Sequence, residues 1–366
     1  MRTPSSQIDV LTAAEAAVEP PLTGEASPLR GLRVVLVSAG PLARETARLA
    51  TGLQLDEAVV RRVPSDERSC RRPTRRGGRS SFDAELAAAI GAGADVVLVD
   101  AGSGEEAGRR ALAAIERACE AGVRTVLCVR ERGVSSSDAA ARAADMVVVP
   151  SAPVRDAVRL HIGVEAHVAP DVIDEPGIET PPARAEGRLR LVCMADLDGA
   201  HGVETVVDAA AIAANAGVDL ALSVIGDGGD LSAVASHAKL LLRGRVAFRG
   251  AVPREEIRTE LASADLFVGA SREPDADEAV AAALAAGVPV VTTAEPHAAW
   301  RVQHGENGLV SKARDARELA RSIETLDADR DTLVDLAWCA KVRALRWTWD
   351  GVRADWARCL IPLRTA

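Results

Sequence analysis

Glycines and charged residues follow several apolar runs in the second half of the chain, at places where a ligand could be contacted. Gly226-Asp227-Gly228 comes directly after the run Leu220–Ile225, and Arg249-Gly250 comes after Val246–Phe248. A glycine lets the backbone approach a ligand at a place where a Cβ would clash. An arginine binds phosphate oxygens through paired hydrogen bonds. These residue types at these places favour a phosphorylated ligand.

Two further groups of polar residues stand beside expected helices. Arg272 and Glu273 follow the apolar run Leu266–Val268, and His201-Gly202 precedes a helical pattern that starts at Val203. Glu273 is either a ligand contact or a solvated loop residue, and His201 is either a ligand contact or a surface loop residue. Glu278 is either a ligand contact or part of a helix capping box, because Asp275 and Glu278 have the spacing of such a box.

Short apolar runs alternate with helical patterns in the first half of the chain, which is typical of a doubly wound α/β domain. Strands are expected at Leu32–Val37, Ala58–Val63, Asp95–Val99, Arg124–Val129, Asp145–Val149 and Val164–Ala169. Helices are expected at Ala43–Leu53, Phe82–Ile90, Glu105–Ala121 and Ala152–His161. Residues 1–30 are polar and aperiodic, so we expect a flexible N-terminal tail.

The alternation restarts after a segment rich in Pro and Glu, Ile173–Gly187. Strands are then expected at Leu189–Met194, Leu220–Ile225, Val246–Phe248, Leu266–Val268 and Val288–Thr292. Helices are expected at Val203–Asn215, Glu255–Ala262, Glu278–Ala286 and Ala316–Leu326. We therefore predict a first domain at 31–174, a linker at 175–188, a second domain at 189–345 and a C-terminal helical segment at 346–366.

Two successive Rossmann-like α/β domains follow from this pattern. Open α/β sheets bind ligands beyond the carboxyl ends of their strands, at the point where the strand order reverses. Two such domains facing each other would place a site in the cleft between them. Trp338, Trp347, Trp349 and Trp356 are expected to anchor the C-terminal helices by packing.

Several motifs between residues 144 and 356, taken in their order, resemble glycosyltransferase family 4, whose members have the GT-B fold and retain the anomeric configuration. The matching segments include Asp145–Ser151, Val168–Asp174, Val224–Gly228, Val246–Val252, Ala264–Val268 with Ser271–Glu273, Gly287–Val291, Gly305–Val310 and Thr348–Asp350. The resemblance covers about 144–356. It implies that the first domain binds an acceptor and the second binds a nucleotide-sugar donor.

The resemblance also implies roles for individual residues. Glu273 would contact the donor sugar, and the other donor-binding candidates are His201, Gly202, Gly226, Asp227, Gly228, Arg249, Gly250, Val252, Arg272 and Glu278. The nucleotide-sugar would be a substrate, with no cofactor and no metal. The leaving diphosphate of such a reaction gains negative charge, which the protein must stabilise.

Two basic residues that this family uses for the diphosphate are replaced here. Asp196 stands at the family's Arg position and His201 at its Lys position, and Trp300 replaces a glutamate before the block Gly305–Val310. Either the positive charge comes from Arg249, Arg272, Arg243 and Arg245, or the chain keeps the fold without transfer activity. The alternative hypothesis is therefore a non-catalytic GT-B-like module that binds or regulates a true glycosyltransferase.

The segment 61–80 is strongly basic, with eight arginines between Arg61 and Arg79. Such a loop would meet an anionic membrane surface or an acidic acceptor, or it is a solvated insertion. The net charge of −9 and an aromatic content of 2% disfavour nucleic acid as a partner.

Composition sets the remaining limits. Apolar residues make up 48% and charged residues 27%, which is enough for sizeable cores. The six cysteines form no Cys-x-x-Cys pair, so we expect free thiols in a reducing cytoplasm, with Cys128 and Cys193 inside apolar strands. The sequence contains no long uncharged apolar run, so no membrane span is expected. We expect a cytoplasmic protein, with a membrane-peripheral position left open.

Overall fold

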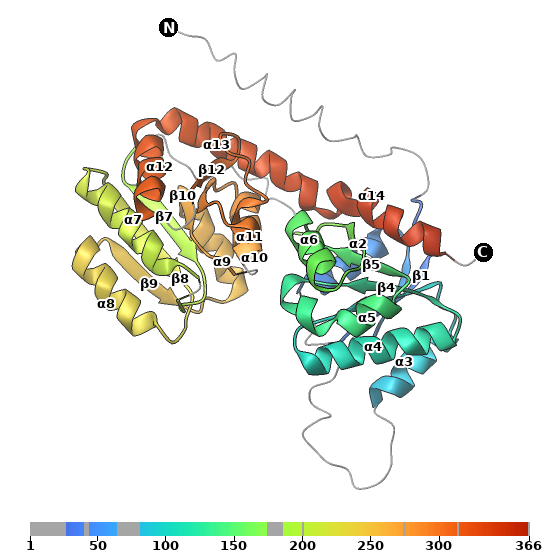
Figure 1. Cartoon of the computed structure of the whole chain (residues 1–366). Helices are drawn as coiled ribbons and strands as arrows, with labels where there is room; N and C mark the ends of the chain where they lie inside the picture. Colours follow the sequence, from blue (N-terminus) through green and yellow to red (C-terminus); the bar gives the residue numbers. More distant parts are fainter. Residues whose placement is uncertain are drawn as a thin grey trace. The chain divides into compact units, whose positions relative to one another are not determined.

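The computed structural model describes residues 27–39, 44–63, 81–173, 186–199, 201–273, 276–312 and 315–364. They form two compact units (Figure 1). The first unit consists of the described residues of 27–173 together with 347–364, and the second of those of 186–346. The expected tail at 1–26, most of the basic segment (64–80), most of the linker (174–185) and Asp275 lie outside the described residues.

The first unit has a parallel sheet of six strands between two layers of helices. In sheet order its strands are β2 (Val59–Val63), β1 (Arg33–Ser38), β3 (Val96–Asp100), β4 (Arg124–Cys128), β5 (Met146–Val149) and β6 (His167–Val168). Its helices are α2 (Arg44–Leu55), α3 (Ser81–Gly91), α4 (Glu105–Glu120), α5 (Asp138–Ala143), α6 (Ala152–His161) and α14 (Trp349–Leu360), with short 3₁₀ turns η2 (Glu131–Ser136) and η4 (Ile361–Leu363).

Alternate residues of each strand in the first unit face different helix layers. Val35 and Val37 of β1 belong to the core under α3, α4 and α6. Val34 and Leu36 belong to the core under α2 and α14. Because both faces are covered, the strands read as continuous apolar runs in the sequence.

The second unit repeats this architecture with a second parallel sheet of six strands. In sheet order its strands are β12 (Gly308–Ser311), β11 (Val290–Thr293), β10 (Leu266–Gly269), β7 (Leu189–Met194), β8 (Leu220–Ile225) and β9 (Val246–Gly250). Its helices are α7 (Val203–Asn215), α8 (Leu231–Leu242), α9 (Arg254–Ala262), α10 (Ala276–Ala285), α11 (Pro296–Ala299), α12 (Ala316–Ala328) and α13 (Arg330–Ala344). A 3₁₀ turn, η3 (Leu345–Trp347), connects α13 to α14.

The α/β class, the order of the elements and most of their bounds agree with the sequence prediction. The exceptions are short or lie in segments to which the sequence assigned no element, namely α5, α8, α11 and β12. The strand expected at Val164–Ala169 is only two residues long. Cys128 and Cys193 are buried in strands, as predicted. Of the four tryptophans expected to pack in the C-terminal helices, Trp349 and Trp356 are buried, Trp347 is half-buried and Trp338 is 40% exposed.

Candidate functional site

The order of the strands reverses between β7 and β10 in the second unit. From β7 the chain proceeds to β8 and β9 on one side, and β10 to β12 follow on the other side. The chain after β7 therefore leads to one side of the sheet and the chain after β10 to the other, and such a reversal is where open α/β sheets bind ligands. The carboxyl edge of this sheet is the candidate site.

The loop after β7 runs beside the loop after β8. The backbone N–H of Ala195 donates to the carbonyl of Ile225 at 3.1 Å, and that of Leu197 donates to the carbonyl of Asp227 at 2.9 Å. A Cβ on Gly226 would lie 1.9 Å from the Ala195 carbonyl oxygen, and one on Gly228 would lie 2.4 Å from that of Leu197. The room that these two glycines leave is therefore filled by the chain's own backbone.

His201 lies at the end of the same loop and is buried, with only 5% of its surface exposed. Its Nδ1 lies 2.6 Å from Oδ1 of Asp198. The interpretation of His201 as a surface loop residue is therefore wrong. The next residue, Gly202, caps α7 with a left-handed backbone (φ 67°). A Cβ there would lie 2.3 Å from the carbonyl oxygen of Ala270, so the loops after β7 and β10 touch.

The other residues named from the sequence lie around this edge in different states. Asp227 and Arg272 are exposed, Val252 is half-buried, and Glu278 is exposed in the first turn of α10. Glu273 is half-buried, and its backbone N–H donates to Oγ of Ser271 at 3.1 Å.

Arginine positions separate into two groups. Arg249 and Gly250 end β9 at the carboxyl edge, where Nε of Arg249 lies 3.4 Å from a carboxylate oxygen of Glu260. Arg243 and Arg245 precede β9, at the amino ends of the strands. A parallel sheet keeps these two edges apart, so the prediction that Arg243 and Arg245 supply charge to the site is wrong.

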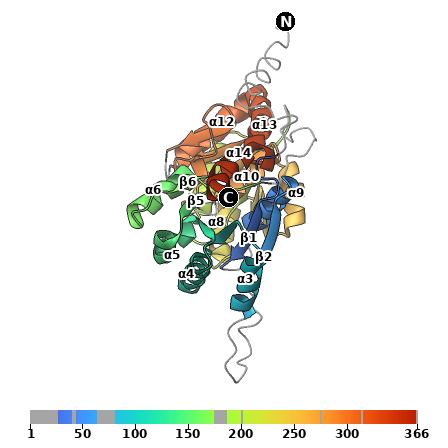
Figure 2. The same cartoon turned by 90° about the vertical axis from the view of Figure 1, so that its right-hand side faces the viewer.

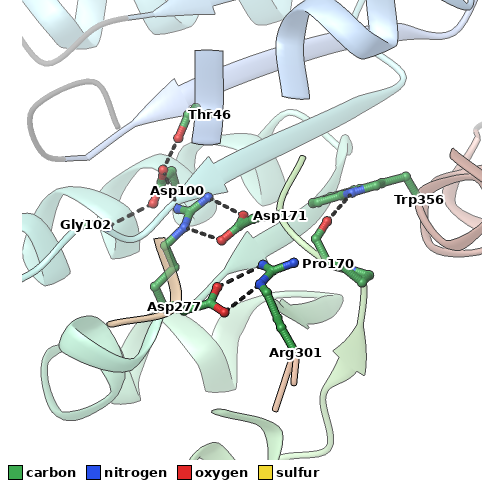
Figure 3. Close-up of polar contacts among 9 residues, drawn as sticks. Thr46, Asp100, Gly102, Pro170, Asp171, Asp277, Arg301 and Trp356 are labelled. Carbon is green, nitrogen blue, oxygen red and sulfur yellow. Dashed lines mark hydrogen bonds and ion pairs between the residues drawn. The ribbon is translucent and has the colours of Figure 1, made fainter. Parts of the chain in front are cut away.

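A group that sequence reasoning missed stands at the start of α10 (Figure 3). The carboxylate of Asp277 accepts hydrogen bonds from Nε and Nη2 of Arg301 at 2.6 and 2.8 Å, the pair that Figure 3 draws. It also accepts a hydrogen bond from the Trp300 indole at 2.5 Å. The guanidinium carbon of Arg301 lies 4.3 Å from the centre of the Trp300 ring. The partners are more than twenty positions apart in the sequence, and the only sequence signal was an acidic residue in the first turn of a helix.

Charge at the candidate site is therefore mixed. Asp196, Asp227 and Arg272 are all exposed there, while Arg249 and Arg301 lie next to carboxylates. Chemically, this edge can accept hydroxyl hydrogen bonds on its carboxylates and can attract an anion through Arg272 and the N-termini of α7 and α10.

The first unit has its own reversal of strand order, between β1 and β3. At that edge Asp100, which is 4% exposed, accepts hydrogen bonds from Thr46 and from Arg130, the latter at 2.8 Å (Figure 3). Arg130 also binds both carboxylate oxygens of Asp171, at 2.8 and 3.1 Å. The sequence signals were an aspartate ending the run Val96–Asp100 and an arginine after β4, and the prediction did not use them.

A thiol lies beside this second group of polar residues. Burial raises the pKa of Cys128 well above its usual value, so the thiol stays protonated at neutral pH. Among the described residues, no group of three or more His, Cys, Asp or Glu side chains has an arrangement suited to a metal ion. None of the described helices combines the length and apolar character needed to cross a membrane.

Comparison with known proteins bears on the second unit first. Residues 188–329, from β7 through α12, match the family described as glycosyl transferases group 1. A GDP-mannose-dependent alpha-(1-6)-phosphatidylinositol monomannoside mannosyltransferase of Mycobacterium tuberculosis (strain ATCC 25618 / H37Rv) is 31% identical over 206 residues, covering 50% of this chain and 53% of the relative. A lipopolysaccharide core biosynthesis glycosyltransferase of Rhizobium meliloti is 34% identical over 137 residues, covering 37% and 38%. The chain thus matches about half or less of the length of these relatives.

Solved structures align with most of the chain, in both units. Anabaena HepE, determined in complex with UDP and glucose, aligns with 90% of this chain and 99% of its own, with a TM-score of 0.66 and 15% identity. A glycosyltransferase from Rickettsia africae aligns with 91% of this chain and 98% of its own, with a TM-score of 0.69 and 12% identity. At these identities the likeness shows the fold, which is that of the GT-B glycosyltransferases, with two Rossmann-like halves.

Proposed function

We propose that this chain is a glycosyltransferase that binds a nucleotide-sugar donor at the carboxyl edge of the second unit's sheet and transfers the sugar with retention, as in glycosyltransferase family 4. The observation that carries the proposal is the match of residues 188–329 to a glycosyltransferase family. That match begins just before β7 and includes both strands of the reversal.

In the proposed reaction the bond between the anomeric carbon and the diphosphate breaks, and an acceptor oxygen bonds to that carbon and loses its proton. The nucleoside diphosphate leaves with the bonding electron pair, and its phosphate oxygen takes up the acceptor's proton. Glu273 would hold the sugar hydroxyls, Arg272 would face the diphosphate, and Gly250 with Val252 would border the nucleoside. Neither a metal nor a cofactor takes part in this proposal.

The acceptor would bind to the first unit. Two relatives bear names that concern lipid-linked or lipopolysaccharide acceptors, a phosphatidylinositol mannoside in one case. We propose a related acceptor at an anionic membrane surface, with Arg61 and Arg62 contributing positive charge, because both are exposed on the edge strand β2. The protein would then be cytoplasmic and membrane-peripheral.

Donor binding can be tested by calorimetric titration with UDP-, GDP- and ADP-sugars. We expect one donor class to bind and Arg272→Gln to weaken binding by about tenfold or more, because a charge-assisted hydrogen bond contributes about 1.5–3 kcal/mol. Arg245→Gln is the matched control, since Arg245 is also exposed in the second unit but lies at the amino edge. Equal losses in both variants would argue against a donor site at the carboxyl edge.

Transfer itself needs a separate measurement. Proton NMR of the glycoside formed with a phosphatidylinositol mannoside acceptor would report the configuration at the anomeric carbon, and retention is expected. If no donor of the panel binds, the proposed function is wrong. If a donor binds tightly and no acceptor supports turnover, the non-catalytic module becomes the better hypothesis.

A further inference from the structure

The pair Asp277–Arg301 places a carboxylate and a guanidinium at the start of α10, beside the reversal of strand order. Asp277 is in the first helical turn, and α10 follows β10, which neighbours β7. The side chain of Arg301 is 1% exposed and that of Asp277 is 23% exposed. The two hydrogen bonds between them are parallel, so each charge has a fixed and close counterion.

The segment that carries Arg301 is held independently of this ion pair. Asn307, which is wholly buried, donates from Nδ2 to the carbonyl of Arg301 at 2.9 Å and accepts the backbone N–H of Gln303 at 2.7 Å. Arg301 therefore reaches Asp277 from a loop whose backbone is fixed by other contacts.

Helix stability alone does not account for the buried arginine. A carboxylate in the first turn already interacts favourably with the helix dipole without a counterion. Burying a guanidinium carries a desolvation cost that an ion pair often only offsets. What the arginine changes is the charge of the helix start, because an unpaired Asp277 would repel any anion that approached the same N–H groups.

We propose that Arg301 is a positioning residue for the donor site, which neutralises Asp277 so that the start of α10 can accept a diphosphate. The inference rests on the proposed function and adds to it the residue pair that sets the local charge. Trp300 orients the same carboxylate through its indole N–H and covers the guanidinium with its ring.

Four variants separate charge from structure. Within the pair, Arg301→Gln leaves a negative charge, Asp277→Asn leaves a positive charge, and the double variant Asp277→Asn/Arg301→Gln leaves neither. Glu278, in the same helical turn, is unchanged in all of them. Trp300→Phe perturbs the same group without changing its charge. Affinity is measured calorimetrically for GDP and UDP, with guanosine and uridine as uncharged comparison ligands, after circular dichroism has shown that each variant is folded.

The expected order follows the local charge. Asp277→Asn should bind the diphosphate that wild type prefers about tenfold more tightly, and Arg301→Gln about tenfold more weakly, because the charge at the helix start changes by one unit in opposite directions. The diphosphate affinity of the double variant and that of Trp300→Phe should stay within about threefold of the wild-type affinity. Nucleoside affinity should not follow this order.

The signs make the test decisive even if one single variant does not fold, because either one alone predicts a direction. Unchanged or weaker diphosphate binding by Asp277→Asn would overturn the inference, as would unchanged binding by Arg301→Gln. A tenfold loss in the double variant would overturn it too. If wild type binds neither GDP nor UDP, the proposed function fails; if it binds one without this order, only the inference fails.

Discussion

Glycines at the carboxyl edge of the second sheet differ in what a side chain there would meet. Gly226 and Gly228 face carbonyl oxygens of the loop after β7, whereas Gly202 faces the carbonyl of Ala270 in the loop after β10. Gly250 has a similar left-handed backbone, with φ 70°, but no atom lies within 4 Å of its Cβ position. Substitution of Gly202 and Gly250 can therefore distinguish the two effects: both positions have a left-handed backbone, but only Gly202 has a close steric contact.

Gly202→Ala should damage the site more than Gly250→Ala. Both variants force an alanine into a left-handed conformation, which costs about 1–2 kcal/mol. Only the alanine at 202 must also push apart the loops after β7 and β10. We expect a loss of donor affinity and of thermal stability that exceeds the loss in Gly250→Ala, measured by titration and calorimetric melting. Equal effects of the two variants would mean that the contact with Ala270 is not important.

At the residue scale, the sequence predicted the positions of candidate residues better than their partners. Glycines and charges after apolar runs can be recognised locally, because strands end where such runs end. The partner of Arg249 on α9, Glu260, and the partners of Asp277 after β11 depend on how helices pack, and no local pattern contains that information. His201 is buried for the same reason: its loop lies against a neighbouring loop.

At the scale of elements, both units use the same ion pair to join the two strands of the reversal. Arg33 of β1 binds Asp95, just before β3, through its backbone N–H at 2.7 Å and its guanidinium at 2.5 and 3.1 Å. Arg190 of β7 binds Asp265, just before β10, through its backbone N–H at 2.9 Å and its guanidinium at 2.5 and 2.9 Å. These pairs hold together the amino ends of neighbouring strands whose following connections lead to opposite sides of the sheet.

Asp95→Asn should remove a pH-dependent part of the first unit's stability. The hydrogen bond from Arg33 holds the pKa of Asp95 below its ordinary value. A lowered pKa stabilises the fold above the unfolded-state value of about 3.9, and this stabilisation is lost as the pH falls through the lower folded-state pKa. We expect the free energy of unfolding of wild type to exceed that of Asp95→Asn by about 1–2 kcal/mol at pH 7, since Arg33 is half exposed, and by less at pH 3.

Urea denaturation at pH 7, 5 and 3 measures this difference. Asp138→Asn is the matched control, because Asp138 forms an exposed ion pair with Arg142 whose loss should cost at most about 0.5 kcal/mol. A difference between wild type and Asp95→Asn that stays constant from pH 7 to pH 3 would contradict the assignment.

The sequence predicted the sheets well because their strands are buried on both faces. It missed α8 and β12 for different reasons. Leu240 on α8 is 74% exposed, so the leucine-rich end of this helix gives no clean apolar face. The strand β12 begins at Gly308, where a Cβ would lie 2.0 Å from the carbonyl of Val290, so a residue that usually interrupts strands is required by close pairing.

At the scale of the whole molecule, the chain returns to the first unit after it has completed the second. The backbone N–H of Ile173 donates to the carbonyl of Trp347 at 2.9 Å, and α14 then packs on the same core as α2. Figure 2 shows α14 on the side of the sheet away from α4 and α5. A Cβ on Gly52 of α2 would lie 2.3 Å from the Trp349 ring, which shows how closely the two helices pack. Sequence patterns indicated a helical segment at 346–366 but not the core that it joins.

Trp356→Ala should therefore destabilise the first unit although residue 356 follows the whole of the second. Trp356 is 3% exposed, and its indole donates to the carbonyl of Pro170 at 3.3 Å. Removing a buried tryptophan costs about 3–5 kcal/mol. Trp338→Ala on α13 is the matched control, because that ring is 40% exposed and should cost roughly 1 kcal/mol or less. Hydrogen exchange should become faster in β1, β3 and β4 of Trp356→Ala and stay unchanged in β7 and β8. Faster exchange in β7 and β8 instead would contradict the assignment of α14 to the core of the first unit.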